Sequence, residues 1–490
     1  MTTTREDLQW PAGPATATPG ATIRDTEFLG LKVLDAWQRD LDARGLRATG
    51  SDSHHAYIAS LVQRLAQVGV GEVRQETLPL RRWTPQRWQL TLDGEPGGEA
   101  RPVEVPLVSP VAYSGRTCAD GVIAPLSAEP VTGRIGVVDI ALPALQAQVF
   151  DELDWGDPQE VRHDADYDPA TPYERVWLSQ DSMREHLDRF ARVGASGLIL
   201  VVDLPAEALR EGYLLYDGVH RGLPAVFVSR EQGALLRAAA AEGREATLVL
   251  EARVEDVETA NVLGLIPGAS DELVVLHSHT DGTNGLEDNG PEAILAMAQY
   301  LARVPQAELP RSVLVLLTTG HFTTHTAWGL EAFLERHQDD LVPQIAAALC
   351  LEHLGARPWP HDQQEGVPAR QHEFGCTFAS PHQAVIDAVR RGLDRAAVTE
   401  SRVLRPFVPD TTGRSPDGTT WPGDGSAFWH TAGLPSANFI TGPGYLLNAE
   451  PVMDFIDVEA MRRQAIAFTE TVIELCTVPF ADLHTRRNTQ

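Results

Sequence analysis

The spacing of apolar residues changes along the 490-residue chain and divides it into regions. Residues 1–21, rich in Thr, Pro, Ala and Gly, predict a loose N-terminal arm. From residue 23 to about 70 the spacing is helical, and strand-like runs follow at 71–80 and 87–92. One apolar stripe on a helix face is formed by Ile58, Leu61, Val62 and Leu65. This opening is typical of an α/β domain.

Beyond residue 252, short apolar strands alternate with helical segments. The expected strands cover residues 273–279, 312–319 and 345–354. The expected helices cover residues 291–304, 326–337 and 458–475. Such alternation predicts a mostly parallel sheet with helices on both faces.

Between these halves, residues 102–251 have a different texture. Short β-like runs at 134–140, 197–203 and 223–229 accompany one helical segment at 181–195. The polar, carboxylate-rich stretch 151–174 predicts a long exposed loop. We therefore expect an arm over 1–21, an α/β domain over 22–101 and 252–490, and an inserted domain over 102–251.

Composition and charge restrict the classes of molecule that the protein is expected to bind. The net charge of −28 argues against a sequence-independent grip on nucleic acid or on an anionic membrane. The sequence contains neither a signal-like apolar start nor an apolar run of bilayer length. Its four cysteines are widely spread, which favours reduced thiols. We expect a cytoplasmic protein that handles a small peptide or amide substrate and associates, at most, with further copies of itself.

Groups that can bind a metal follow three of the predicted strands. The candidates are His279, Asp281 and Asp288 after the first strand, His321 and His325 after the second, and Glu352 and His353 after the third. Ligands of open α/β sheets bind at the carboxyl ends of the strands, and imidazole and carboxylate groups suit zinc. Asp281 is placed to orient the His279 imidazole through its carboxylate. The alternative, surface or helix-capping roles, suits one residue such as Asp288 better than the whole set.

These residues lie in a run that resembles a known family. The stretch 261-NVLGLIPG, followed by LVVLHSHTDG and GLEDNGPEAILAMAQYLA-302, is similar to the zinc aminopeptidases of metallopeptidase family twenty-eight. Further similarity lies in 47-RATGS-51 and in 423-GDGSAFWHTAGLPSANF-439, and residues 189–203 and 222–229 resemble a protease-associated domain. The resemblance implies a zinc-exopeptidase-like core with an inserted β-rich protease-associated domain. It also implies that His279 is a zinc ligand, Asp281 its support and Asp288 a bridging ligand.

The sequence departs from that family at the reacting groups. Gly320 stands where the family has its general-base glutamate, and Leu446 stands where it has its last histidine ligand. His321 and Glu352 fall at two other ligand positions, where the family has glutamate and aspartate. On this basis His279, Asp288 and Glu352 form one metal site, and a second keeps only Asp288 and His321.

Several histidines are left over by this comparison. His321, His325 or His353 is expected to replace the missing base, whereas His277 is expected to be a bystander. His430 is read as a partly buried or surface imidazole.

We therefore expect a hydrolase that uses one or two Zn²⁺ ions to cleave a peptide or amide bond of a small substrate. Two alternatives stay open. One is a non-catalytic homologue that uses its cleft only for binding, because the base and one ligand are replaced. The other is a single-zinc acyl-transfer enzyme of the glutaminyl cyclase type.

Overall fold

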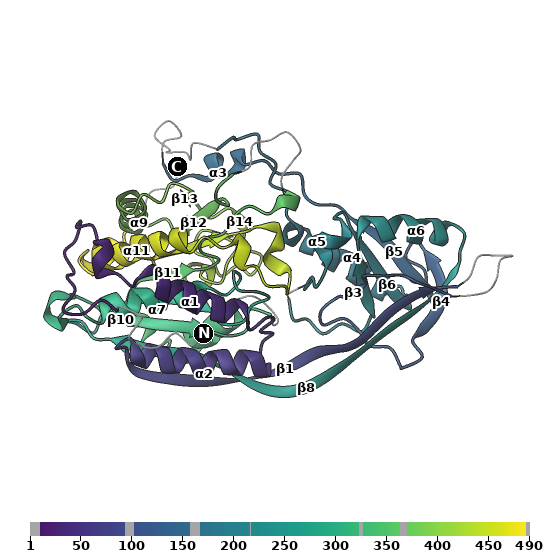
Figure 1. Cartoon of the computed structure of the whole chain (residues 1–490), viewed down its shortest axis with the longest axis horizontal. Helices are drawn as coiled ribbons and strands as arrows, with labels where there is room; N and C mark the ends of the chain where they lie inside the picture. The colour runs from purple at the N-terminus through teal and green to yellow at the C-terminus, as the bar shows by residue number, and fades with distance from the viewer. Residues whose placement is uncertain are drawn as a thin grey trace.

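A computed structural model describes residues 10–93, 102–156, 167–215, 217–322, 327–362 and 370–486. The molecule has a larger and a smaller lobe joined by two long strands, β1 (Gly71–Leu92) and β8 (Glu245–Ile266) (Figure 1). These strands pair antiparallel along their whole length, from Gly71 opposite Leu265 to Leu92 opposite Ala246. β1 is thus one strand where the sequence predicts two.

The sheet of the larger lobe runs in the order β13-β12-β16-β11-β9-β10-β8. Its central strands β16, β11, β9 and β10 are parallel, whereas β12 pairs antiparallel with β16 and β8 pairs antiparallel with β10. The prediction of a mostly parallel α/β sheet is confirmed for this lobe. The strand bounds are β9 (Leu273–His279), β10 (Ser312–Thr318), β11 (Ile345–Leu351), β12 (Gly375–Ala379), β13 (Ser401–Leu404) and β16 (Ser436–Thr441).

Helices cover both faces of this sheet, because successive strand residues point to opposite sides. Val274 and Leu276 of β9 join the core under α7, while Leu273 and Val275 join the core under α8. The helices are α1 (Leu31–Asp42), α2 (Asp52–Gln67), α7 (Gly290–Leu301), α8 (Trp328–Arg336), α9 (Gln383–Arg395), α10 (Ser426–His430), α11 (Val458–Leu475) and α12 (Phe480–Leu483). Short 3-10 helices are η1 (Asp25–Glu27), η3 (Gln306–Glu308), η4 (Val342–Gln344), η5 (Pro360–Asp362), η6 (Gly444–Leu447) and η7 (Met453–Phe455), and a small ribbon pairs β14 (Val408–Pro409) with β15 (Thr419–Thr420).

Helix α2 illustrates how the sequence builds this lobe. The Ser51 side chain caps the helix by accepting a hydrogen bond from the His54 N–H. The predicted stripe is buried at Ile58, Leu61 and Leu65. The same face therefore packs into the core while the opposite face stays in solvent.

The smaller lobe is a parallel sheet with helices rather than a purely β-rich unit. Strands β4 to β7 are parallel neighbours, β3 pairs antiparallel with β7, and β4 pairs antiparallel with β8. The bounds are β2 (Val103–Glu104), β3 (Ser109–Pro110), β4 (Val122–Ser127), β5 (Ile135–Ile140), β6 (Gly197–Val202), β7 (Ala225–Val228), α4 (Gln180–Arg192), α5 (Ala206–Leu209) and α6 (Arg230–Ala241). The predicted boundary at residue 251 falls inside β8, and the protease-associated assignment stays a prediction.

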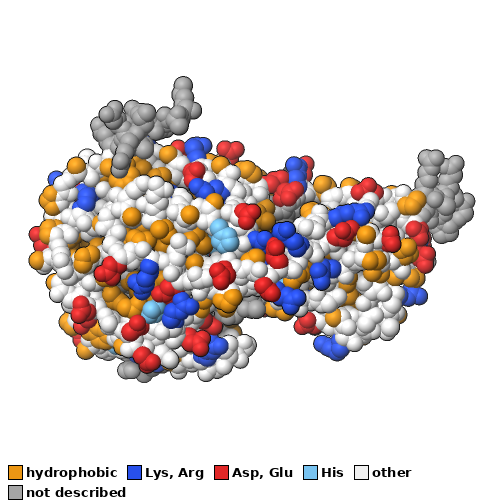
Figure 2. Space-filling model, turned by 90° about the horizontal axis from the view of Figure 1, so that it is seen from below, with side chains coloured by type: hydrophobic (Ala, Val, Ile, Leu, Met, Phe, Trp, Pro, Cys, Tyr) orange, Lys and Arg blue, Asp and Glu red, His pale blue; other side chains and the backbone are white. Residues whose placement is uncertain are grey.

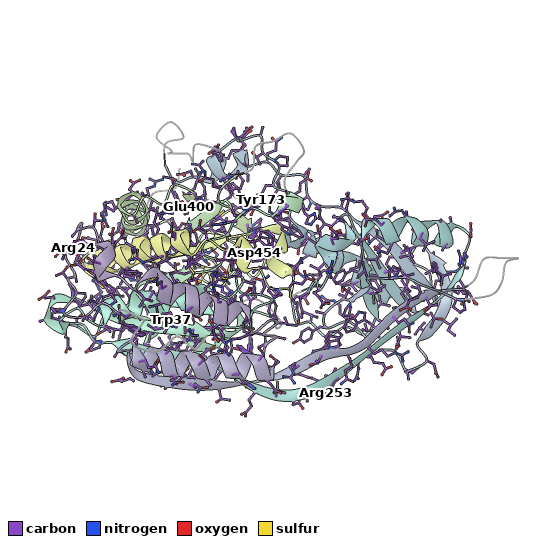
Figure 3. All side chains as sticks on the ribbon, viewed as in Figure 1. Arg24, Trp37, Tyr173, Arg253, Glu400 and Asp454 are labelled. Carbon is purple, nitrogen blue, oxygen red and sulfur yellow. The ribbon has the colours of Figure 1, made fainter. Side chains whose placement is uncertain are left out.

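Part of the inserted region leaves the smaller lobe and packs on the larger one. Helix α3 (Gln148–Leu153) lies beside β13, away from α4 and β6 (Figure 1). Tyr173 lies above the strands of the larger lobe, on the same side as Glu400 (Figure 3). In the described part of 151–174, Asp154 and Tyr173 are buried. Since Glu152, Glu174 and residues 168–170 are exposed, the prediction of an exposed loop is confirmed only in part. The chain then returns through η2 (Val176–Ser179) to α4.

The N-terminal arm is docked where it is described. Trp10 packs edge-on against Trp37 of α1, and the Ala15 N–H donates to the Arg303 carbonyl oxygen after α7. Residues 10–16 therefore belong to the folded lobe and are not the loose arm that composition predicts.

The surface of the molecule carries mixed charge. On the face that holds α2, β1 and β8, acidic and basic side chains are interspersed (Figure 2). Within the described ranges, no helix combines the length and the apolar character needed to cross a bilayer.

Candidate metal centre

The site forms where three parallel strands end side by side. Thr318, the last residue of β10, is paired with His279, the last residue of β9. β11 lies on the other side of β9, and Glu352 and His353 follow it directly. The fold thus brings together groups that are more than 70 positions apart in the sequence.

Three atoms that could bind a metal lie close together there, and none has a hydrogen-bond partner among the described residues. They are His279 Nε2, Glu352 Oε2 and His353 Nε2, all in buried side chains. The ligand atoms of these residues lie within 4.8 Å of one another, and His279 Nε2 is 3.9 Å from Glu352 Oε2. Because buried polar atoms are rarely left unpaired, this arrangement fits a cation.

The two imidazoles are prepared as ligands by main-chain contacts. His279 Nδ1 lies 2.9 Å from the Asp281 carbonyl oxygen, and His353 Nδ1 lies 2.6 Å from the Thr441 carbonyl oxygen. A carbonyl only accepts, so each Nδ1 carries the hydrogen and each Nε2 offers a lone pair. Burial lowers the pKa of His353 to about 3 and holds the pKa of His279 well below its usual value. Both rings are therefore neutral, the form that binds zinc.

One oxygen of Glu352 is fixed so that the other faces the histidines. Oε1 accepts hydrogen bonds from Cys350 Sγ at 3.1 Å, the Asp424 N–H at 3.1 Å and Asn438 Nδ2 at 3.0 Å. Burial and the nearby Asp424 carboxylate raise the pKa of Glu352 to about 7. Oε2 remains directed at His279.

Cys350 is itself held from behind. His277 Nδ1 lies 3.1 Å from Cys350 Sγ, and His277 Nε2 lies 2.9 Å from Thr318 Oγ1. Both ring nitrogens of His277 thus contact other side chains, and one of these, Cys350, contacts Glu352.

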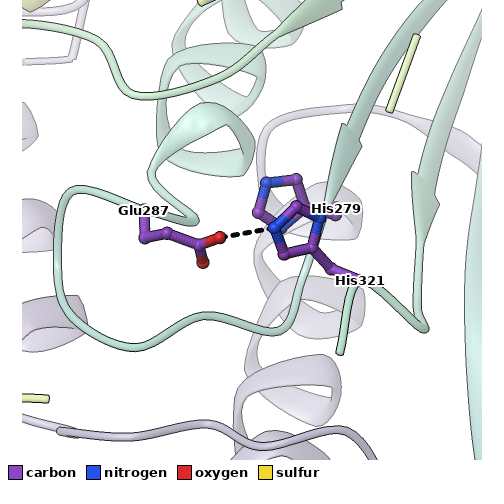
Figure 4. A group of neighbouring side chains, drawn as sticks. All are labelled: His279, Glu287 and His321. Carbon is purple, nitrogen blue, oxygen red and sulfur yellow. Dashed lines mark ion pairs between the residues drawn. The ribbon is translucent and has the colours of Figure 1, made fainter. Parts of the chain in front are cut away.

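A second group, beside the first, holds a charged histidine between two carboxylates. His321 forms an ion pair with Glu287 (Figure 4), in which Nε2 is 2.6 Å from Oε1. His321 Nδ1 is 2.9 Å from Asp424 Oδ1. Burial alone would lower the pKa of His321, but Glu287 and Asp424 outweigh it and raise that pKa well above its usual value. The ring stacks on His279, with centroids 4.1 Å apart and planes 7° apart. Since both of its nitrogens face carboxylates, His321 suits proton handling better than metal binding.

Glu287 completes this group. Burial raises the pKa of its carboxyl to about 7, and Oε2 has no hydrogen-bond partner in the described structure. The donor atoms of His279, Glu287 and His321 also lie within 4.8 Å of one another, so this group offers a place for a second ion if His321 loses its proton.

The predicted role of Asp281 is wrong in its chemistry. Its carboxylate accepts from Thr49 Oγ1, from the Gly320 N–H at 3.1 Å and from the Phe322 N–H at 3.4 Å, while only its main-chain oxygen contacts His279. The chain turns after β9, so the carbonyl and not the side chain faces the ring. Asp281 therefore fixes the turn that carries His321.

Asp288 is not among the converging donors either. Both of its oxygens contact the buried Arg47 guanidinium, with Nε to Oδ2 at 2.7 Å. Among the described residues, the groups that could hold an ion include His279, Glu352 and His353 but not Asp288, so the set of His279, Asp288 and Glu352 stays a prediction. Arg47 pairs with both oxygens of Asp288, and this carboxylate is not in the groups of described residues that could hold an ion.

The other predicted positions fall as follows. Gly320 has a φ of +98°, a conformation that disfavours a side chain and thus the missing glutamate. Leu446 is buried in η6 and lines the cavity next to the cluster. His430 of α10 contacts Thr420 Oγ1 at 3.3 Å, away from the cluster, and His325 lies outside the described residues.

The sequence analysis missed two members of the site, Glu287 and Asp424. Glu287 directly precedes Asp288 in the same motif, and Asp424 lies in 423-GDG-425 at the start of another stretch that carries the resemblance. Both were therefore within reach of motif reading. The motifs do not predict the direction in which each carboxylate points.

The fold is similar to that of solved zinc aminopeptidase structures. No protein-family model matches the sequence, and no curated protein matches it. Among solved structures, BSAP, a zinc aminopeptidase from Bacillus subtilis, aligns with a TM-score of 0.62 at 15% identity, over 92% of this chain and 97% of its own. An aminopeptidase from Aneurinibacillus sp. strain AM-1 aligns with a TM-score of 0.58 at 14% identity, over 90% and 93%. A Peptidase M28 precursor from Shewanella amazonensis SB2B aligns with a TM-score of 0.62 at 15% identity, over 92% of this chain and 98% of its own. The chain shares their fold.

Proposed function

We propose that this protein is a zinc-dependent hydrolase that cleaves a peptide or amide bond of a small substrate. The observation that carries the proposal is the convergence of His279 Nε2, His353 Nε2 and Glu352 Oε2, buried and without partners in the described structure. Two neutral imidazoles and one carboxylate are a ligand set that zinc takes in catalytic sites. The shared fold with zinc aminopeptidases supports the same choice of metal.

When bound, zinc supplies a Lewis acid that polarises a carbonyl oxygen and makes water acidic near neutral pH. The chain's own residues supply the rest. Asp281 holds the turn that carries His321, and the carbonyl oxygens of Asp281 and Thr441 hold His279 and His353 in one tautomer.

Gly320 stands where the family has its general base, and glycine cannot accept a proton. Glu287 is our candidate for this base. Its Oε2 accepts a proton from the attacking water and returns it to the departing nitrogen. A pKa of about 7, raised by burial, allows both transfers at neutral pH. His321, charged and fixed by Asp424, stays beside Glu287 Oε1 and stabilises the carboxylate whenever it is ionised.

The experiment measures metal and turnover separately. Protein stripped with a chelator is titrated with Zn²⁺ by calorimetry, and hydrolysis of aminoacyl p-nitroanilides is followed with and without the metal. Glu287→Gln is expected to lower kcat about 10²–10⁴-fold and to keep one tightly bound zinc. Glu308→Gln, an exposed site in η3, is the matched control and should behave as the unchanged protein.

Other outcomes separate the alternatives. The absence of stoichiometric zinc, together with activity that survives the chelator, would overturn the proposal. Tight zinc without hydrolysis would select a binding-only protein, and cyclised product without hydrolysis would select an acyl-transfer enzyme. A second equivalent of zinc lost in His321→Ala would place another ion at His279, Glu287 and His321.

A further inference from the structure

An apolar cavity of about 150 Å³ opens directly beside the cluster. His321, Glu352 and His353 form its polar end. The remaining lining residues that the structure describes are apolar or uncharged, and Leu446 is one of them. The residue that stands where the family has a histidine ligand thus serves here as cavity wall.

The size and chemistry of the cavity restrict what enters it. A cavity of about 150 Å³ lined by apolar side chains accommodates a group the size of benzene. A charged group in such surroundings, without an opposite charge to pair with, loses more hydration free energy than it regains. The cavity therefore suits a branched aliphatic or phenyl group and disfavours an ammonium or carboxylate.

Much of the wall comes from the excursion of the inserted region onto the larger lobe. We call residues 145–156 and 167–178 the roof segment. It contributes Leu145, Val149, Phe150, Leu153, Tyr173, Trp177 and Leu178 to the lining. The strands and the 440–446 stretch of the larger lobe contribute the opposite wall. The cavity thus exists only because two distant parts of the chain meet.

The roof segment is fastened by a buried arginine. Arg175 Nη2 is 2.9 Å from Glu373 Oε1, and Arg175 Nε is 3.1 Å from the Gly442 carbonyl oxygen and 3.3 Å from Asp362 Oδ2. Trp177 Nε1 donates to the same Gly442 oxygen at 3.1 Å. Because Gly442 is also part of the lining, these contacts set the height of the cavity.

We infer that the roof segment selects the substrate: it admits a compact, uncharged apolar group next to the scissile bond and rejects charged side chains. This inference rests on the proposed function for the identity of the bond that is cleaved. The geometry that carries it is an apolar cavity whose polar end holds Glu352 and His353, two of the three proposed ligands.

The test uses zinc-loaded full-length protein and amino-acid hydroxamates, which bind zinc and need no turnover. Leucine, lysine, glutamate and glycine hydroxamates share one backbone, so differences in affinity report the side chain alone. By calorimetry, leucine hydroxamate is expected to bind about tenfold or more tightly than the lysine and glutamate compounds. Equal affinity for the three would overturn the inference.

Two variants place the effect on the roof segment. Val149→Trp, which fills the cavity, should remove the leucine preference and leave zinc and glycine hydroxamate binding unchanged. Leu235→Trp, which adds a tryptophan on the exposed face of α6, is the control. Leu145→Arg at the half-open rim needs no repacking and should strengthen glutamate hydroxamate binding about threefold or more.

Retention of the leucine preference in Val149→Trp, with no gain in Leu145→Arg, would contradict the role of the roof segment. If the unchanged protein does not bind zinc, the proposed function is contradicted instead. The two failures are thus distinguished by the zinc titration alone.

Discussion

Glu352 shows how single residues prepare the candidate centre. Its Oε1 accepts three hydrogen bonds, and its Oε2 therefore remains directed at His279. Groups that orient a metal ligand affect affinity although they never touch the metal. Cys350 is such a positioning residue, and His277 positions Cys350 in turn.

Replacing Cys350 tests this arrangement. Cys350→Ala removes one of the donors to Glu352 Oε1, and we expect zinc affinity to fall about tenfold. Cys350→Ser keeps a donor and should recover most of the loss. The measurement is zinc calorimetry at neutral pH, with Cys118→Ala, at an exposed thiol, as the control. Unchanged zinc affinity in Cys350→Ala would show that the other two donors suffice.

At the scale of elements, α2 and α7 are joined by a buried ionic contact. Arg64 of α2 donates to both oxygens of Glu292 at the start of α7, at 2.6 and 2.8 Å, and Tyr57 also donates to this carboxylate. Because α7 begins just after the loop that carries Glu287, this contact also fixes one side of the site.

Breaking this contact should be costly. Arg64→Ala leaves Glu292 buried with only the Tyr57 hydroxyl, and we expect the free energy of unfolding to fall by about 3 kcal/mol. Arg39→Ala removes an exposed partner of Asp35 on α1 and should change stability within error. Denaturant unfolding of the two variants makes the comparison. Equal stability of both variants would mean that Glu292 reaches water when Arg64 is absent.

At the scale of the whole molecule, zinc and protons are expected to compete for the same site. The pKa values of Glu287 and Glu352, raised by burial to about 7, mean that the metal-free fold holds protons there. The stabilising contribution of these protons is complete below the ordinary glutamate pKa of 4.5 and is lost as the pH rises through about 7. Zinc takes over above that pH, because only the ionised carboxylates bind it well.

Thermal unfolding with and without zinc measures this competition. The zinc-induced rise in unfolding temperature should be larger at about pH 8 than at about pH 5.5, since at the lower pH zinc must displace protons. Glu352→Gln should lose most of the zinc response at both values. An equal rise at both values in the unchanged protein would argue against these carboxyls as part of the site.

The sequence alone was enough to place most of the candidate site. Alternating apolar strands and helices predict a parallel sheet, and parallel strands end at one edge. His279, His321, Glu352 and His353 all follow strands closely, so their convergence was predictable from local pattern. The same pattern placed β9, β10, β11, α7, α8 and α11 to within a few residues, whereas β12, β13, β16 and α9 were not predicted.

Three decisions belong to the tertiary structure alone. Glu287 and Asp288 are neighbours in the sequence. Arg47, which is 241 positions from Asp288, pairs with Asp288, whereas Glu287 points into the cluster. Asp281 meets His279 through its carbonyl because of the turn that follows β9. Leu153 and Tyr173 of the roof segment line the cavity, although they lie in the 151–174 stretch that composition reads as an exposed loop. Local sequence fixes which residues follow each strand, whereas the direction of a side chain and the partner it meets depend on contacts between distant segments, which no local pattern encodes.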